Sequence, residues 1–261
     1  MTVFLHELKR NKLSLILWSA AISFMLGVCV LIYPEMSSQM TEISDMFADM
    51  GSFSAAFGMD KINFGEFMGY FGIECGNVLG IGGALFAAIL GTSALSNEEK
   101  NRTAEFLLTH PISRSAVVLQ KLLSVITQIV IMNVAVFAVT MLSILIVNVD
   151  ADMGVLLLMF LAYLMLQIEI AAITFGISAF LKRGGLGIGL GIALAFYFMN
   201  ILSNLSEDVE KLKYITPFGY TEGADIIANH SIKIEYLAVG IAFAAVGIAV
   251  AFWKYSKKDI S

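Results

Sequence analysis

Long apolar stretches alternate with short polar segments along this chain of 261 residues. A helix that crosses a bilayer needs about 20 consecutive, mostly apolar residues. Stretches of that kind predict six spanning helices, at residues 13–33, 67–95, 118–147, 154–181, 186–203 and 236–253. The second, third and fourth stretches are longer than a bilayer requires, so we expect them to tilt or to extend beyond the hydrocarbon. The predicted fold is an all-α integral membrane protein with one transmembrane domain over residues 1–261.

The composition supports a membrane protein. Hydrophobic residues make up 58% of the chain and charged residues 14%, and the mean hydropathy is +0.83. A soluble domain would carry roughly a quarter of charged residues. The first apolar stretch follows basic residues, as in a signal peptide, but it is too long for a typical signal sequence, so we expect it to remain as the first span. Cys29 and Cys75 both fall in apolar stretches and are predicted to be free thiols.

Lysine and arginine are distributed unevenly between the two sides of the predicted bundle. Six spans place both termini on one side, and twelve of the sixteen lysine and arginine residues lie on that side. Because cytoplasmic loops are enriched in these residues, both termini and residues 96–117 are predicted to be cytoplasmic. In the first outer loop, apolar residues recur at helical spacing and predict an amphipathic helix that lies on the membrane or folds back onto it. These residues are Met40, Ile43, Met46, Phe47 and Met50.

The segment from residue 96 to residue 121 is the most strongly charged, helix-capable part of the predicted cytoplasmic side. Ser96-x-x-Glu99 is a capping-box pattern, in which the serine and glutamate side chains each bind a free amide at the start of a helix. Pro111 predicts the end of that helix, because the residue before a proline is displaced from the helical region. The next helix, which becomes the third span, would start at Pro111 or Ser113.

A short apolar face runs along this predicted helix and consists of Ala104, Leu107 and Leu108. One interpretation is an amphipathic turn that rests on lipid headgroups. The other is a docking helix for a soluble partner, with the leucines as buried anchors and the charges as a rim that sets the register. The apolar pattern alone leaves both open.

The chain reads NEEKNRTAEFLLTHPISR at residues 97–114, and Lys121 follows. This order of an acidic pair, a basic residue, threonine, an acidic residue, paired leucines, proline, Ser-Arg and lysine resembles the signature loop of type-2 ABC transporter permeases. Residues 214–220, YITPFGY, resemble the aromatic-Ser/Thr-Pro-Phe-x-Tyr segment before the last span of that family. Asn101 stands where many members carry glycine, and we do not expect it to change the function.

The resemblance implies a coupling helix, between spans two and three, that sits in a groove of a separate ABC ATPase subunit. ATP and magnesium would bind to that subunit. The chain has no G-x-x-x-x-G-K-[ST] motif and is expected to be a transport subunit without a cofactor or an enzymatic site of its own. The residues implied at the interface with the ATPase subunit are Glu99, Arg102, Thr103, Glu105, Leu107, Leu108, Pro111 and Arg114.

The resemblance also implies a second permease subunit, identical or related, with the substrate moving between the two. The outer ends of the spans and residues 214–225 would shape the extracellular gate. Because the spans contain few charges, we expect the exported substrate to be hydrophobic or amphipathic, such as a peptide, an antibiotic or a lipid-like molecule. The expected location is a bacterial plasma membrane, in contact with lipid, and nothing predicts binding to nucleic acid.

Gly72, Gly76 and Gly80 recur every four residues in the second span, and Gly187 and Gly191 repeat this spacing in the fifth. Small residues at this spacing allow a neighbouring helix to approach closely. We interpret these faces as packing surfaces. A second interpretation is that they slide during a conformational cycle.

Two carboxylates, Glu74 and Glu169, are predicted to lie within the membrane. A carboxylate there should be neutral, paired or directed into a cavity. They could form part of a substrate or proton pathway, or they could make structural hydrogen bonds to a neighbouring helix. The pathway interpretation supports a rival function, an ion-coupled secondary transporter or a channel, although the chain lacks the matched, interrupted helices of many such transporters. No catalytic or metal-binding constellation is predicted.

Overall fold

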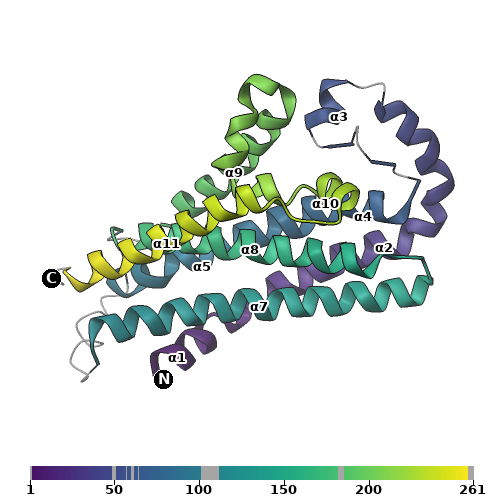
Figure 1. Ribbon diagram of the computed structural model, residues 1–261. Helices are drawn as coiled ribbons and strands as arrows, with labels where there is room; N and C mark the ends of the chain where they lie inside the picture. Colours follow the sequence, from purple (N-terminus) through teal and green to yellow (C-terminus); the bar gives the residue numbers. More distant parts are fainter. Residues whose placement is uncertain are drawn as a thin grey trace.

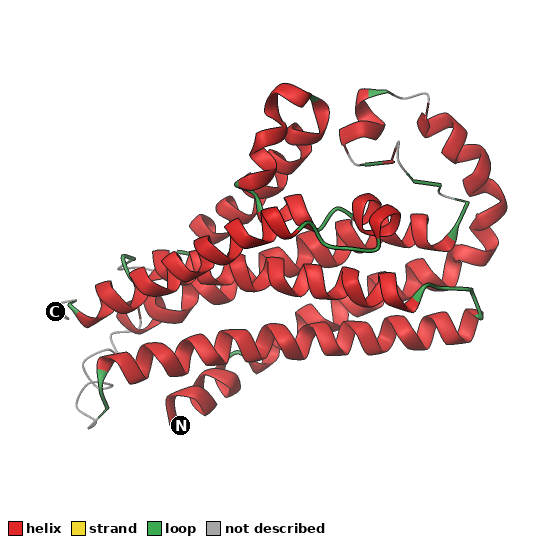
Figure 2. Cartoon of the chain, in the orientation of Figure 1, coloured by secondary structure: helices red, strands yellow, loops and turns green. Residues whose placement is uncertain are grey.

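The computed structural model describes residues 2–48, 51–56, 58–59, 62–63, 65–100, 112–181 and 185–257. All regular secondary structure in these ranges is helical (Figure 2). Six helices in the described chain are long and apolar enough to cross a membrane, which confirms the predicted fold class. The spans are Lys12–Ser37, Phe67–Asn97, Arg114–Val147, Met153–Ser178, Leu186–Leu205 and Ile234–Ser256.

Helix α8 (Met153–Ser178) is at the centre of the bundle. It packs most extensively against α5 (Gly82–Lys100) and α11 (Ile234–Ser256), while α7 (Arg114–Val147) runs along α2 (Lys12–Ala48). The core between these helices is made of apolar side chains that are fully or almost fully buried. They include Phe71, Phe86, Met132, Leu156 and Phe175.

Polar side chains fix the limits of the long helices. Ser113 begins α7, because its hydroxyl accepts a hydrogen bond from the amide of Ala116 at 3.2 Å. This confirms the predicted start of the third span. Asp152 begins α8 in the same way and accepts from the amide of Gly154 at 2.8 Å. Such caps satisfy amides that have no partner within the helix.

The second span is not one regular helix. It consists of α4 (Phe67–Cys75), the π-helical segment η2 (Gly76–Ile81) and α5. A π-helical segment shifts the faces of the helix relative to an ideal α-helix. The four-residue spacing of small residues gave no sign of this change.

The first span extends much further than predicted. Helix α2 continues through Pro34 to Ala48, and Figure 1 shows its far end rising away from the bundle. Residues 40–48 are helical, as predicted for the first outer loop, but they continue α2 and do not start a new helix; Met50 lies outside the described residues. A proline lacks the amide hydrogen and disturbs the preceding turn, but it did not end this helix. A short helix, α3 (Ser52–Ala56), follows.

The two ends of the bundle differ in construction. Both termini lie at one end, together with α1 (Thr2–Arg10), the start of α7 and the end of α11, and we call this the inner end (Figure 1). The opposite, outer end carries η3 (Glu207–Tyr214), η4 (Pro217–Tyr220) and α10 (Gly223–Asn229). Helix α9 (Leu186–Leu205) is inclined away from the other spans and leads into these short helices (Figure 1).

Candidate coupling end and transport pathway

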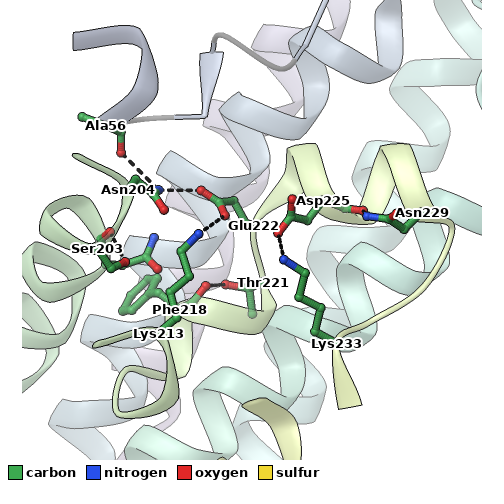
Figure 3. A network of polar contacts seen from close by, with 11 residues as sticks. Ala56, Ser203, Asn204, Lys213, Phe218, Thr221, Glu222, Asp225, Asn229 and Lys233 are labelled. Carbon is green, nitrogen blue, oxygen red and sulfur yellow. Dashed lines mark hydrogen bonds and ion pairs between the residues drawn. The ribbon is translucent and has the colours of Figure 1, made fainter. Parts of the chain in front are cut away.

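Glu222, which precedes α10, connects several elements of the outer end (Figure 3). Its Oε2 accepts from Lys213 Nζ of η3 at 3.4 Å, and its Oε1 accepts from the amide of Asn204 in α9. That amide also donates to the carbonyl oxygen of Ala56 in α3 at 3.3 Å. The charged side chains of Lys213 and Glu222 are only 6% and 8% exposed. One buried ion pair and its hydrogen bonds therefore join α3, α9, η3 and α10.

A second ion pair connects α10 to the last span. Lys233, which precedes α11, donates to Asp225 Oδ2, and the amide of Asn229 donates to the carbonyl oxygen of Asp225 at 2.9 Å (Figure 3). Burial lowers the pKa of Lys233, but the hydrogen bond and the charge of Asp225 outweigh burial and raise this pKa above its ordinary value. The ammonium group is therefore charged at neutral pH and holds α10 against the start of α11.

A cavity of about 70 Å³ lies beside this network and is lined by side chains of the second, fourth and fifth spans. Asn77, Tyr163 and Glu222 contribute polar groups to its wall. Asn200 and Asn204 also line it, and their buried amide oxygens accept no hydrogen bond from the described residues. The cavity can hold water-sized groups, and the two amide oxygens offer acceptors to them.

Glu169 lies on α8 and is almost completely buried. Its Oε2 accepts a hydrogen bond from Tyr220 Oη of η4 at 2.9 Å, and Gly240 of α11 lies directly against its carboxyl group. Burial, and then the nearby carboxylate of Glu169, raise the pKa of Tyr220, so its hydroxyl stays protonated and can donate. Tyr220 ends the YITPFGY segment, and this segment therefore contacts a carboxyl group within a span.

Glu74 has different surroundings from Glu169. It lies on α4, is half-buried, and accepts from Cys29 Sγ of α2 at 3.6 Å. Both cysteines are free thiols, as predicted. Each of the two predicted intramembrane carboxylates thus has a partner on a different neighbouring element. A role for either in a transport pathway stays a prediction.

The glycines of the second span face two different elements. A methyl group added at Gly76 or Gly80 would lie 3.1 Å from Tyr163 of α8, and one at Gly72 would lie 2.8 Å from Ile227 Cδ1 of α10. These contacts agree with a packing face, and the sliding interpretation stays untested. The fifth span is different, because no atom of the described residues lies within 4 Å of a methyl group placed at Gly187 or Gly191.

Gly189, between those two residues, packs closely against the second span. An added methyl group there would lie 2.7 Å from Thr92 Oγ1 and 2.9 Å from the carbonyl oxygen of Ala88. Within one chain, Gly189 is the residue of this part of α9 that packs against the second span, and the packing role predicted for Gly187 and Gly191 stays a prediction. The inclination of α9 leaves Gly187 and Gly191 uncovered within one chain.

At the inner end, Lys121 lies fully buried in α7. Its Nζ donates to Glu7 Oε1 of α1 at 2.9 Å and to the carbonyl oxygen of Ala94 in α5 at 2.6 Å. Glu7 also forms an ion pair with Arg10, within α1. Three helices therefore meet at one buried pair of charges.

Arg114 stands at the start of α7, and its Nη1 donates to the carbonyl oxygen of Ser256 at the end of α11, at 3.4 Å. Among the residues implied at the ATPase interface, it is the one whose side chain the structure describes. Glu99 lies in the last turn of α5. The other implied interface residues, which lie outside the described ranges, are Arg102, Thr103, Glu105, Leu107, Leu108 and Pro111.

The predicted capping box is wrong. Helix α5 continues through Ser96 to Lys100, so Ser96 lies inside a helix and does not start one. Its hydroxyl is buried and donates to the carbonyl oxygen of Thr92 at 2.6 Å. A serine within a helix can form this bond to the preceding turn as an alternative to capping. The second span extends further toward the inner end than its apolar pattern indicated.

The family comparison adds a decisive observation to this geometry. A family model described as "ABC-2 family transporter protein" matches residues 1–260. The chain belongs to the ABC-2 transporter family. A search of curated proteins found no match. Permeases of this family are transmembrane subunits, and a separate ABC ATPase hydrolyses ATP for them.

Two contacts of this ABC-2 permease were not found by sequence reasoning. Lys121 belonged to the resemblance, but its partner Glu7 did not, because the two residues are 114 positions apart. The sequence offered one indication of this pair: Glu7 is the single acidic residue of α1, an otherwise basic N-terminal helix, and it lies on the buried side of that helix. The sequence drew attention to Tyr220 and to Glu169 but not to their contact. These residues are also far apart in the chain, and they meet only because η4 packs back against the bundle.

Proposed function

We propose that this ABC-2 permease is the membrane subunit of an ATP-driven exporter. The observation that carries the proposal is the family match over nearly the whole chain. The described residues also include six helices that are long and apolar enough to span a membrane. The excess of lysine and arginine at the inner end supports a cytoplasmic position for this end. An ABC ATPase would dock there on residues 96–117, with Leu107 and Leu108 as buried anchors. The chain contributes positioning and movement, and its partner contributes ATP hydrolysis.

The packing suggests how a movement would pass outward from that segment. The segment includes the end of α5 and the start of α7, and α5 packs extensively against α8. Helix α8 carries Glu169, which accepts a hydrogen bond from Tyr220 at the outer end. A shift of α5 relative to α8 would therefore move a carboxyl group that contacts the outer helices. This supports a role for residues 214–225 in the extracellular gate.

We infer a second permease subunit from the uncovered apolar faces. In the most apolar parts of α9 and α11, 17% and 11% of residues are buried within one chain. Exposed apolar side chains on these helices include Leu194, Phe198, Ile241 and Val246. Lipid covers part of this surface, and an identical or related permease would cover the rest. A substrate path between two such faces suits a hydrophobic or amphipathic molecule.

The direct test is transport by the purified complex in sealed vesicles. The full chain is purified with the ABC ATPase subunit that accompanies it and is inserted into vesicles of phosphatidylglycerol and phosphatidylethanolamine, with the ATPase outside. The probe is a fluorescent amphipathic peptide. We expect ATP-dependent uptake, which corresponds to export in the cell, and we expect an ionophore to leave this uptake unchanged.

The rival function predicts the opposite dependence. An ion-coupled transporter would take up the same peptide in response to a proton gradient without ATP, and that result would reject the proposal. Glu74→Gln and Glu169→Gln test the pathway separately. Unchanged uptake by both variants would remove the two carboxylates from the pathway and leave the ATP-driven function in place.

A further inference from the structure

The pair Lys121–Glu7 is buried far more deeply than an ordinary surface ion pair. The Lys121 side chain has no exposed surface, and the Glu7 side chain is 4% exposed. A buried charge is tolerated only with close partners, and removal of one partner leaves the other uncompensated. Loss of the contacts of Lys121 Nζ with Glu7 and with the carbonyl oxygen of Ala94 would therefore be costly.

These contacts lie at the base of the segment that resembles the coupling signature. Ala94 is less than two helical turns before the end of α5, and Lys121 is about two turns after the start of α7. Residues 101–113 connect these two helix ends. The hydrogen bond from Lys121 to Ala94 thus fixes the separation of the two helices from which that segment extends.

The same region of α7 holds α1 at a second point. Gln120 Oε1 accepts a hydrogen bond from the amide of Phe4 at 3.4 Å. The first amides of a helix have no partner within it, so this contact satisfies one of them. Val3 is also buried, whereas His6 and Lys9 are exposed on the other side of α1. Helix α1 is therefore attached to α7 at its first turn through Gln120 and one turn later through Lys121.

We propose that Glu7 and Lys121 are positioning residues for ATP-driven transport. Their ion pair joins α1 to α7, and with the hydrogen bond from Lys121 to Ala94 of α5 it makes these three helix ends move as one body when the ATPase moves the segment between α5 and α7. This inference rests on the proposed function. It assigns the lysine of the signature a task inside the permease: it does not contact the ATPase, but transmits the movement that the ATPase produces.

The experiment uses the full chain co-purified with its ABC ATPase in lipid nanodiscs. The readout is ATP turnover per assembled complex, compared with turnover by the isolated ATPase subunit. Glu7→Gln keeps the size of the side chain. In this variant, the difference in ATP turnover between the complex and the isolated ATPase subunit should become at least about fivefold smaller, while the amount of bound ATPase stays the same. Lys121→Met should reduce this difference in ATP turnover in the same way. The double variant should be no worse than Lys121→Met alone, because both single changes remove the same ion pair.

Lys9→Gln is the matched control, because it removes an exposed charge from the same helix and should leave turnover unchanged. The melting temperature of each complex is measured in parallel. Variants that melt earlier but turn over ATP like the wild type would show that the pair only supports folding, and this would overturn the inference alone. A wild-type chain that binds no ATPase would overturn the proposed function and the inference together.

Discussion

The inner and outer ends of this permease both bury an ion pair, but they do so in different ways. At the inner end, Lys121 is completely enclosed and contacts helices α1 and α5 directly. At the outer end, Lys213 and Glu222 belong to a wider network of short helices, next to a cavity of about 70 Å³. Two buried amide oxygens there, on Asn200 and Asn204, lack a hydrogen-bond donor among the described residues.

The difference indicates which of the two ion pairs is held more rigidly. A fully satisfied buried contact rigidifies its surroundings, whereas a partly satisfied polar network can rearrange at low cost. We therefore expect the inner end to move as one body and the outer end to change its contacts. This division suits a transporter that receives force at one end and opens at the other.

The largest expected effect comes from the two buried lysines. Lys121→Met leaves the buried Glu7 with Arg10 as its charged partner, and because Arg10 is 27% exposed and Lys121 is fully buried, the free energy of unfolding should fall by about 3–5 kcal/mol. Lys213→Met leaves Glu222 with its hydrogen bond from Asn204, so we expect a smaller loss, of about 1–3 kcal/mol. Denaturant unfolding of the permease in detergent, followed by tryptophan fluorescence, measures both. Equal losses would contradict the proposed difference between the ends.

Glycine substitutions sharpen the comparison through packing. An added methyl group at Gly91, in the inner half of the second span, would meet backbone atoms of Ala171 and Phe175 as well as Thr174. At Gly72, near the outer end, it would first meet the flexible Ile227 Cδ1. Gly91→Ala should therefore cost about 1–3 kcal/mol in unfolding experiments and Gly72→Ala less than about 1 kcal/mol.

Gly187→Ala is the reference for these two substitutions, because the part of the chain that the structure describes leaves the space within 4 Å of the added group open. At Gly187, alanine changes the helix propensity but not the packing, so the free energy of unfolding should rise slightly. A cost at Gly72 as large as the cost at Gly91 would show that the outer end is packed as rigidly as the inner end.

Tyr220→Phe removes the hydrogen bond to Glu169 that joins the outer segment to the fourth span. The loss should be about 1 kcal/mol, because one hydrogen bond to a buried group disappears while the aromatic ring remains. Thermal melting of the detergent-solubilised permease measures it. A loss above that of Lys121→Met would reverse the predicted order of the two ends.

The smallest effect is expected at an exposed pair of the outer end. His230 Nδ1 lies 3.8 Å from Asp152 Oδ2, and both side chains are largely exposed. Such pairs contribute little, so His230→Gln should change the free energy of unfolding by less than about 1 kcal/mol. The same unfolding measurement checks this, and a larger change would mean that the exposed contacts carry more of the outer end than its geometry indicates.

The sequence was most informative where one physical requirement dominates. Each span needs a long apolar stretch, so six spans could be predicted from local pattern, as could a helix start at Pro111 or Ser113, of which Ser113 proved to be the cap. It was least informative where the chain has local alternatives. Ser96 has the residue type of a helix cap but bonds to the preceding turn, and Pro34 does not end its helix.

Long-range pairing set the second limit of prediction. Glu7 and Lys121, or Tyr220 and Glu169, find each other only after the spans have packed. The faces of a helix also depend on its geometry: the π-helical segment in span two and the inclination of α9 decide which glycines are covered. Spacing in the sequence assumes a regular helix and reveals neither.

The central claim is that residues 96–117 of this permease receive an ABC ATPase. The most direct measurement is the amount of ATPase subunit that co-purifies with Leu107→Ala/Leu108→Ala, compared with Leu142→Ala/Leu145→Ala, which makes the same change at exposed positions toward the other end of α7. We predict a decrease of at least about tenfold for the first pair and none for the second. Equal amounts of ATPase with both pairs would contradict the account.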